Sequence, residues 1–326
     1  MDESAQLLKK KIEAEAARLG FSACGVARVD EPDAAVLRRY DEWVSSGACA
    51  GMDYMRRYVE VRRQPALLLP GARSMVCVAL PYAPSRRLPA DVPQISCYAY
   101  GEDYHEAIRR RLHALLAFVR EACAPQPVAG RACVDTAPLF EKYWAARAGI
   151  GWVGRHTQLI LPGKGSAHFL GELLLDVDLP PDEPLRGGCG RCRRCIDACP
   201  TGALRLRANG VADGAPALLD ARLCLSCQTI EFRGEVLPDA VKKAMGGRIY
   251  GCDECQKACP HNRGVEASTV PEFALSDELA GMTLADWRRL TPKGFRRLFR
   301  RSAVRRAGYE ALMRNLRAAF PDDAEG

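Results

Sequence analysis

Nine of the fifteen cysteines lie between positions 189 and 259, and their spacing constrains this part of the chain more than any other feature. Cys189, Cys192, Cys195 and Cys199, followed by Pro200, form the run C-x2-C-x2-C-x3-C-P. Three thiolates at this spacing on a tight loop can face one iron-sulfur cube, and the fourth reaches a second cube. The run therefore predicts [4Fe-4S] ligation and a segment that transfers electrons one at a time.

A second, incomplete motif supplies ligands for the second cluster. Cys252, Cys255 and Cys259 precede Pro260 in the pattern C-x2-C-x3-C-P, and the missing ligand comes from the CLSC sequence at Cys224 and Cys227. Spacing alone does not decide which of these two cysteines binds the second cluster. Crossed ligation of the kind found in bacterial two-cluster ferredoxins gives one set of Cys189, Cys192, Cys195 and Cys259, and another of Cys199, Cys252, Cys255 and either Cys224 or Cys227.

Tetrahedral zinc is the alternative, because C-x2-C pairs also bind zinc, but the full run has a form specific to clusters. The chain shows no signal peptide, so we expect metal ligation rather than disulfides and a reducing, cytoplasmic location. No apolar run approaches the length of a membrane span, so we expect no membrane partner. The remaining cysteines lie mostly in apolar stretches and are expected in the core: Cys24, Cys49, Cys77, Cys97, Cys123 and Cys133.

The rest of the chain alternates helical and strand-like patterns and predicts an α/β (α+β) fold. Helices are expected over residues 4–19, 103–123 and 137–149, and strands over 21–29, 74–82, 95–100, 131–135 and 168–179, the last as one strand or two. A linker rich in proline and glycine, PPDEPLRGG, separates this part from the cysteine motifs. We therefore expect an α/β domain at 1–179, a ferredoxin-like domain at 180–265 and a basic helical region at 266–326.

Asp135 is the candidate catalytic acid. It leaves an apolar strand just before two glycine-rich turns, and a carboxyl group at the mouth of an apolar cavity can act as a general acid near neutral pH. Spacing alone favours a different role, because Asp135 or Thr136 before Ala137-Pro138 fits a helix N-cap with proline in the first turn. Glu141 in the same helix is expected at the surface or in an ion pair.

Neither of the common nucleotide-binding loops, G-x-G-x-x-G after a strand or G-x-x-x-x-G-K-[ST], is evident in the first domain. A flavin or another large ring remains compatible with the sequence. His105 and His156 are candidates for proton transfer or cofactor binding, although a lone histidine is more often structural.

The C-terminal region is rich in arginine. A solvated helical face would explain such a charge run, whereas phosphate contacts would explain it in a protein that binds a polyanion. Five apolar residues interleave with the arginines and predict one packed side and one basic side: Trp287, Leu290, Phe295, Leu298 and Phe299. Within this region we expect substrate phosphate contacts at Arg296, Arg297, Arg300 and Arg301.

A set of ordered motifs closely resembles the epoxyqueuosine reductases: GMDYM, YGEDYH, VDTAP, WAARAGIGWVG, the first cysteine run, CLSCQTIE and GGRIYGCDECQKACPHN. The resemblance implies an oxidoreductase that uses cobalamin and two [4Fe-4S] clusters to reduce epoxyqueuosine to queuosine at the wobble position of tRNA. It also implies that Asp135 donates a proton and that Cys224 completes the second cluster. Family members usually have tyrosine or phenylalanine where this chain has Cys227.

The same resemblance places cobalamin between the first domain and the ferredoxin-like domain. It implies cobalamin contacts at Arg57, Tyr98, Asp135, His156, Thr157 and Ser226. The implied partners are tRNA that contains epoxyqueuosine and an external electron donor, with the protein expected as a monomer.

Two other functions fit the same motifs. A reductive dehalogenase joins the same cofactors but usually carries a twin-arginine export signal, which this chain lacks. A non-catalytic iron-sulfur electron carrier would use the first domain only to dock a partner. Corrinoid binding by the purified protein separates the carrier from both enzymes.

Overall fold

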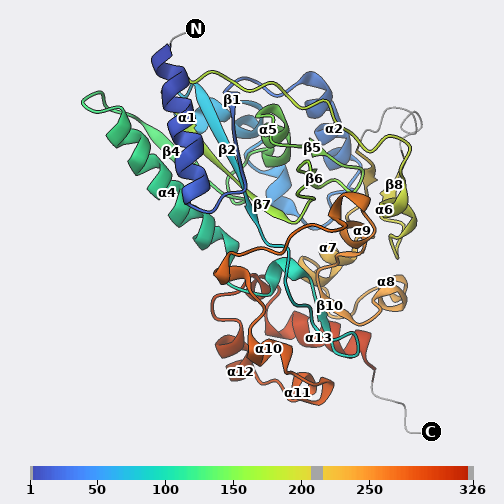
Figure 1. The fold of residues 1–326 in the computed structure, drawn as a ribbon. Coiled ribbons are helices and arrows are strands. Elements are labelled where there is room, and N and C mark those ends of the chain that lie inside the picture. Colours follow the sequence, from blue (N-terminus) through green and yellow to red (C-terminus); the bar gives the residue numbers. More distant parts are fainter. Residues whose placement is uncertain (1–2, 207–215, 322–326) are drawn as a thin grey trace, which may run out of the picture.

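The computed structural model describes residues 3–206 and 216–321 (Figure 1). Its N-terminal part contains a four-stranded sheet in the order β1-β2-β7-β4, and every neighbouring pair is antiparallel. The predicted strands are confirmed there, and the segment expected as one strand or two forms one. The bounds are Ala23–Arg28 for β1, Ser74–Pro81 for β2, Gly130–Cys133 for β4 and His168–Leu175 for β7.

Helices cover both faces of this sheet (Figure 1). The helices α1 (Glu3–Arg18) and α4 (Tyr104–Ala122) pack on one face, and α5 (Glu141–Arg147) packs on the other. Alternate residues of β2 point to opposite faces, with Val76 in the first core and Cys77 in the second. This burial on both faces explains why β2 reads as a continuous apolar run.

The remaining elements of the N-terminal part lie beside the α5 face. The helices α2 (Ala34–Ser45) and α3 (Val59–Arg63) are followed later in the chain by the short strands β5 (Trp152–Val153) and β6 (Leu159–Ile160). Six short 3-10 helices connect or extend the elements described: η1 (Asp53–Arg56), η2 (Pro65–Leu68), η3 (Cys97–Ala99), η4 (Pro260–Asn262), η5 (Pro271–Phe273) and η6 (Ala303–Arg306).

The cysteine-rich part has short elements around a small core of Cys195, Leu204 and Ala217. Its elements are α6 (Arg194–Asp197), β8 (Leu204–Arg205), β9 (Leu218–Leu219), α7 (Leu225–Ile230), α8 (Asp239–Ala244), β10 (Arg248–Tyr250) and α9 (Glu254–Lys257). The helices α6 and α9 pack together. The Ala221 backbone N–H donates to the Ala48 carbonyl at 2.8 Å, which fixes this part beside α2.

The strand expected over residues 95–100 is wrong. The strand β3 covers only Gln94–Ile95, where it pairs in parallel with β10, and the chain then turns into η3. The Asp253 carboxylate accepts the Cys97 backbone N–H at 2.8 Å and a hydrogen bond from Ser96, so a side chain replaces the ladder partner that a longer strand would need.

The C-terminal region forms α10 (Asp277–Ala280), α11 (Leu284–Arg288), α12 (Pro292–Leu298) and α13 (Tyr309–Ala319). Trp287, Phe295 and Phe299 are buried as predicted, and they share a core with residues of the segment 88–100. The Asn315 side chain donates to the carbonyls of Thr229 and Ile249 and so holds α13 against α7 and β10. The predicted α+β fold is confirmed, while the domain limits at 179/180 and 265/266 stay a prediction.

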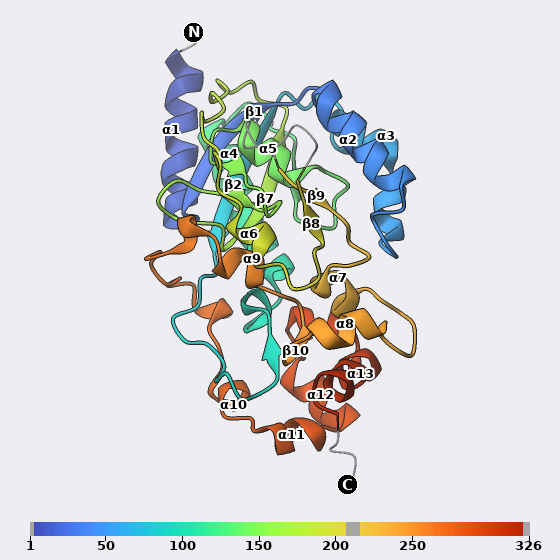
Figure 2. The same ribbon diagram turned by 90° about the vertical axis from the view of Figure 1, so that its right-hand side faces the viewer.

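Figure 2 shows the cysteine-rich elements between the sheet above and the C-terminal helices below. Within the ranges that the structure describes, no helix is long and apolar enough to cross a membrane.

Candidate redox and catalytic site

Four cysteines line one cavity of about 400 Å³: Cys199, Cys224, Cys252 and Cys255. Cys199 follows α6, Cys224 precedes α7, and the other two lie at the start of α9. Cys227 lies instead on the wall of a larger neighbouring cavity. The grouping agrees with the crossed set expected for the second cluster and favours Cys224 over Cys227.

The other set, Cys189, Cys192, Cys195 and Cys259, forms a second group. Burial raises the pKa of Cys195 to about 11, and the neighbouring charges of Cys189, Cys259 and Cys192 add to this shift. Cys189 and Cys192 are half-buried, Cys195 and Cys259 are buried, and all four lie outside the walls of both cavities. We call this group the outward one because none of its members lines either cavity.

The two groups suit clusters better than single zinc ions. Across residues 3–206 and 216–321, no three His, Cys, Asp or Glu side chains gather closely enough to hold one metal ion. A cube of four irons and four sulfides holds its thiolates farther apart than a tetrahedral ion does.

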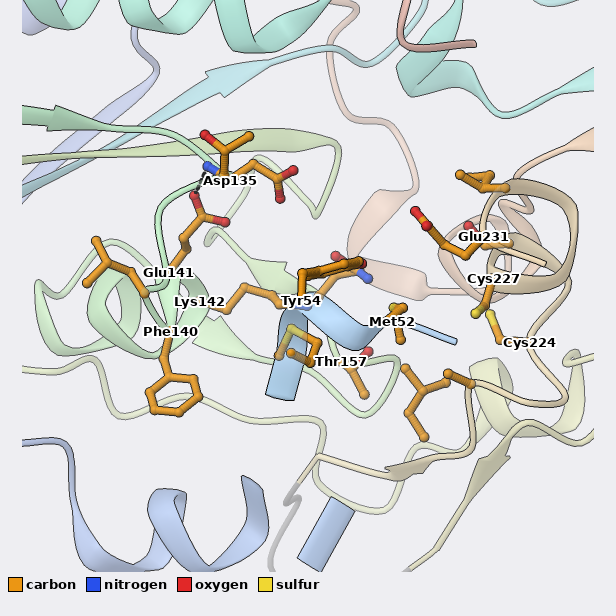
Figure 3. A pocket seen from close by; sticks show the side chains of 18 of the residues that line it. Met52, Tyr54, Asp135, Phe140, Glu141, Lys142, Thr157, Cys224, Cys227 and Glu231 are labelled. Carbon is orange, nitrogen blue, oxygen red and sulfur yellow. Dashed lines mark hydrogen bonds between the residues drawn. The ribbon is translucent and has the colours of Figure 1, made fainter. Parts of the chain in front are cut away.

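The larger cavity has a volume of about 1980 Å³. Pockets for drug-sized ligands hold roughly 300–1,000 Å³, so this cavity has room for a macrocycle together with part of a second molecule. In Figure 3, Asp135, Glu141 and Lys142 lie on one side of it, and Cys224, Cys227 and Glu231 lie on the other. The two cavities share wall residues, among them Tyr98, Asp135, Thr157, Cys224 and Ser226.

The wall of the large cavity contains unusual backbone. Among the residues described, four that are not glycine have positive φ, and three of them line this cavity: Tyr58 at +55°, Asp135 at +39° and Thr157 at +65°. Non-glycine residues in this region are uncommon, and such strain concentrates at functional sites. The positions of these three side chains are therefore fixed by the surrounding fold at an energetic cost.

The capping role favoured for Asp135 by spacing is wrong. The helix α5 begins only at Glu141, with Phe140 at its N-cap, and the residues between Asp135 and Phe140 form a bent loop. Asp135 instead directs its carboxylate into the cavity, to which about half of the side chain (53%) is exposed.

Two residues at the start of α4 donate to this carboxylate. The Tyr104 hydroxyl lies 2.9 Å from Oδ2 of Asp135, and Nε2 of His105 lies 3.0 Å from the same atom. Nδ1 of His105 lies 2.6 Å from Oδ1 of Asp103, the N-cap residue of α4. Burial alone would lower the pKa of His105, but the hydrogen bonds to Asp103 and Asp135 outweigh it and raise that pKa to about 9.

Burial opposes ionisation of Asp135, yet the hydrogen bonds from His105 and Tyr104 hold its pKa below the ordinary value. At neutral pH the pair is thus an imidazolium beside a carboxylate, and the N–H at Nε2 of His105 donates to Oδ2 of Asp135. The motif YGEDYH contributed to the family resemblance, but its spacing gave no sign of the contact with Asp135.

Glu141 supports the Asp135 loop from below. Its Oε1 accepts the Asp135 backbone N–H at 2.6 Å, so it is neither a surface residue nor an ion-pair partner as expected (Figure 3). Burial raises the pKa of Glu141 to about 8, and the charge of Asp135 adds to the shift. Glu172 on β7 is fully buried nearby, and burial raises its pKa as well.

The residues expected to contact cobalamin are mostly brought together. Tyr98, Thr157 and Ser226 line both cavities, and His156 lines the smaller one. Arg57 is exposed and lies off both walls, whereas its neighbour Tyr58 lines the larger cavity.

His156 fits the role of a cofactor contact. Its Nδ1 accepts the Gln158 backbone N–H at 3.1 Å, and its Nε2 is buried with no hydrogen-bond partner in the described part of the chain. Burial lowers its pKa to about 4, so the ring is neutral. A buried polar atom without a partner at a cavity wall is a place for a ligand atom.

The arginines expected to contact the substrate separate into two pairs. Arg300 and Arg301 line the large cavity, while Arg296 and Arg297 do not. Arg297 instead pairs with Glu278.

Sequence reasoning missed a further group on the same wall. Arg306 pairs with Glu231 at 3.0 Å through two nitrogens and lies 5.5 Å over the ring of Tyr54. These residues come from distant segments, and no local pattern signalled their contact.

Comparison with known proteins places these features in a family. Residues 62–136 match the family model described as epoxyqueuosine reductase QueG, DUF1730, and residues 188–262 match the 4Fe-4S double cluster binding domain. An epoxyqueuosine reductase from Cellulophaga algicola is 37% identical over 94% of this chain and 95% of the relative. One from Escherichia coli is 34% identical over 96% of this chain and 80% of the relative.

Solved structures of epoxyqueuosine reductases have the same fold as this chain. A selenomethionine-labelled epoxyqueuosine reductase has a TM-score of 0.85 at 30% identity, covering 96% of this chain and 81% of that one. Another, with a TM-score of 0.83, contains an epoxyqueuosine-modified tRNA-Tyr stem loop. Fold and site together define a reductase with two internal [4Fe-4S] clusters. The chain belongs to the epoxyqueuosine reductase family.

Proposed function

We propose that the chain removes the epoxide oxygen of epoxyqueuosine in tRNA and so forms queuosine. The observation that carries this proposal is one cavity with two chemically different walls. The cysteine group Cys199, Cys224, Cys252 and Cys255 adjoins it on one side, and Asp135 with His105 faces it on the other. Electrons and protons can therefore reach one bound substrate from separate directions.

The reaction consumes two electrons and two protons, because the epoxide oxygen leaves as water and a carbon–carbon double bond remains. The cofactors of the enzyme are two [4Fe-4S] clusters and cobalamin. Cobalamin, when bound, supplies a cobalt centre that accepts single electrons at the substrate. The volume of the large cavity, the partnerless Nε2 of His156 and the shared wall of the two cavities fit such a group.

The chain's own residues then have distinct tasks. Tyr98, His156, Thr157 and Ser226 would hold cobalamin. Cys189, Cys192, Cys195 and Cys259 would hold one cluster, and Cys199, Cys224, Cys252 and Cys255 would hold the other.

Asp135 delivers a proton to the departing oxygen. His105 supplies that proton, since its Nε2 lies 3.0 Å from the Asp135 carboxylate and its pKa of about 9 keeps it protonated at neutral pH. A Bacillus subtilis epoxyqueuosine reductase, 29% identical to this chain, has been solved with an aspartate catalytic loop swung out of its active site. The support for Asp135 is its cavity-facing carboxylate on a strained loop.

The nucleotide enters from the side where Arg300, Arg301, Arg305 and Arg306 line the cavity. Arginines at that rim are suited to the phosphates that flank the modified base. We expect the protein to act as a monomer in the cytoplasm, where its tRNA substrate is found.

The test is conversion of the substrate by anaerobically reconstituted protein. Protein loaded with iron, sulfide and cobalamin, reduced with dithionite and methyl viologen, should convert an anticodon stem loop containing epoxyqueuosine to the queuosine form, detected by mass spectrometry of the nucleosides. Absence of product while the Escherichia coli relative is active under the same conditions would overturn the assignment. Omitting cobalamin should abolish the conversion.

A further inference from the structure

Electrons must enter the protein from outside, and the outward cysteine group lies next to one exposed surface. Cys189 and Cys192 are half-buried on the loop that precedes α6. The inward group lines the cavity that adjoins the substrate site. The short path for an incoming electron therefore begins at the outward group.

Several arginines lie around the outward cysteine group. Arg186, Arg191, Arg193 and Arg194 are exposed, and residues 184–196 include no acid. Arg193 pairs with Asp197 at 2.8 Å. Arg191 and Arg194 form no ion pair within the part of the chain that the structure describes.

A second segment adds to the same surface. The ring of Trp152 packs against Gly187 and lies 5.2 Å from the ring of His261, so the loop before α6 and the segment after α9 lie side by side. The exposed Lys257, which pairs with Glu254 at 3.0 Å, and the exposed Arg263 flank the latter segment. Figure 2 shows α6 and α9 together at the front of the molecule. We call Arg186, Arg191, Arg194, Lys257 and Arg263 the entry face.

The entry face rests on a rigid support. Arg155 is fully buried beneath it, its backbone N–H donates to Sγ of Cys189 at 3.4 Å, and its guanidinium donates to the Gly190 carbonyl at 2.8 Å. The loop that carries Arg191 is therefore held in place before a partner arrives, which lowers the entropic cost of docking.

We propose that the entry face docks a small acidic protein that carries one electron at a time. This inference rests on the proposed function, because the reaction needs two electrons for each epoxide and so two encounters for each turnover. In each encounter the reduced carrier loses one electron and the outward cluster gains it. Opposite charges accelerate such short-lived encounters, whose interfaces are small.

The surface fits a protein better than RNA. Arg300, Arg301, Arg305 and Arg306 line the substrate cavity and belong to the C-terminal region, whereas Arg191 and Arg194 line neither cavity. The entry face is therefore distinct from the arginines proposed to contact the tRNA.

The test compares two ways of reducing the clusters. In the holoenzyme, the Arg191→Gln/Arg194→Gln variant should be reduced by a reduced acidic ferredoxin at least about tenfold more slowly than the wild type at low ionic strength, by stopped-flow absorbance. Reduction by dithionite, a small anion with less charge than an acidic protein, should slow much less. Added salt should slow the wild type and narrow the difference.

Two controls sharpen the comparison. Lys10→Gln/Lys11→Gln removes the same charge from exposed positions on α1 and should leave the ferredoxin rate unchanged. Arg191→Lys/Arg194→Lys keeps the charge and should retain most of the rate.

Three results would overturn the proposal: equal ferredoxin rates in variant and wild type, equal slowing with dithionite, or weaker stem-loop binding with unchanged ferredoxin rates. The last would identify an RNA surface. If the proposed function itself is wrong, the dithionite-reduced wild type will not convert the substrate. That result does not depend on the ferredoxin rates, so the two failures can be told apart.

Discussion

Nε2 of His105 lies 3.0 Å from Oδ2 of Asp135, and Nδ1 of the same ring lies 2.6 Å from Oδ1 of Asp103. The imidazole thus bridges a carboxylate that faces the cavity and one that caps α4. A ring in this position can pass a proton to Asp135 and be reprotonated from the side of Asp103, whose side chain is 37% exposed. The proposed acid therefore has a proton source on a rigid helix.

This contact predicts a pH dependence of turnover. The pKa of His105 is raised to about 9, so the imidazolium is present below that pH and is lost as the pH rises through it. We expect a single-turnover rate that is nearly constant from neutral pH to about 8 and falls above about 9. Rates measured with dithionite-reduced holoenzyme across this range check the expectation.

His105→Gln should remove that descending limb and lower the rate at neutral pH about 10²-fold, because the proton source is lost. His113→Gln, on an exposed position of the same helix, is the matched control and should behave like the wild type. An unchanged descending limb in His105→Gln would assign it to another group.

Asp135→Asn should abolish most turnover while leaving the cofactors in place. The amide keeps the size of the side chain but cannot donate an acidic proton, so we expect a loss of about 10²–10⁴-fold in the single-turnover rate. Iron content and the corrinoid absorbance should match the wild type. Asp91→Asn, at an exposed position off the cavity walls, controls for loss of one carboxylate. A rate close to that of the wild type would show that Asp135 has a purely structural role and does not donate the proton.

The sequence predicted the strands and the cysteine pattern well because both depend on local spacing. Alternation and apolar runs located β1, β2, β4 and β7, and the cysteine spacing predicted the double-cluster domain that residues 188–262 match. Local spacing failed at Asp135, since the proline at 138 suggested a helix start that the bent loop delays to Glu141. It failed at residues 95–100 because Asp253, far along the chain, supplies the hydrogen bonds there.

The contacts of the candidate site that the sequence did not predict were missed for the same reason. Tyr54, Glu231 and Arg306 meet only after three distant segments fold around the cavity. Likewise, nothing local to Tyr104 and His105 signals that the end of β4 lies opposite them. The local pattern of a single sequence carries no record of such contacts.

The two cysteines of CLSC should differ in iron binding. Cys224 lines the cavity shared with Cys199, Cys252 and Cys255, whereas Cys227 lines only the larger one. Cys224→Ser should therefore lose about four of the eight irons of two [4Fe-4S] clusters, and Cys227→Ser should retain all of them. Iron and sulfide analysis of anaerobically reconstituted proteins measures this. Full iron in Cys224→Ser with loss in Cys227→Ser would reverse the ligand assignment.

Gly25 on β1 should be essential for stability. A Cβ atom there would lie 2.0 Å from the Ala148 carbonyl oxygen, at the end of α5, and a backbone atom cannot move aside cheaply. We expect Gly25→Ala to lower the free energy of unfolding by about 1–3 kcal/mol or more, as overpacking does. Gly51→Ala, with no atom within 4 Å of the added Cβ, should change it little. Denaturant unfolding of the two variants side by side gives the comparison, and similar midpoints would show that α5 can shift.

Arg300 and Arg301 should govern the salt dependence of tRNA binding. Both line the cavity, and the side chain of Arg301 makes an exposed ion pair with Glu102 at 3.5 Å. Each phosphate contact that is lost lowers the slope of log affinity against log salt by about 0.7–0.9, so Arg300→Gln/Arg301→Gln should reduce the slope by about 1–2. Stem-loop binding measured from low to physiological salt tests this, with Lys10→Gln/Lys11→Gln as the charge-matched control. The same changes at Arg296 and Arg297 measure how far the contact extends along α12. If the slope for Arg300→Gln/Arg301→Gln equals that of the wild type, these two arginines do not contact the RNA phosphates.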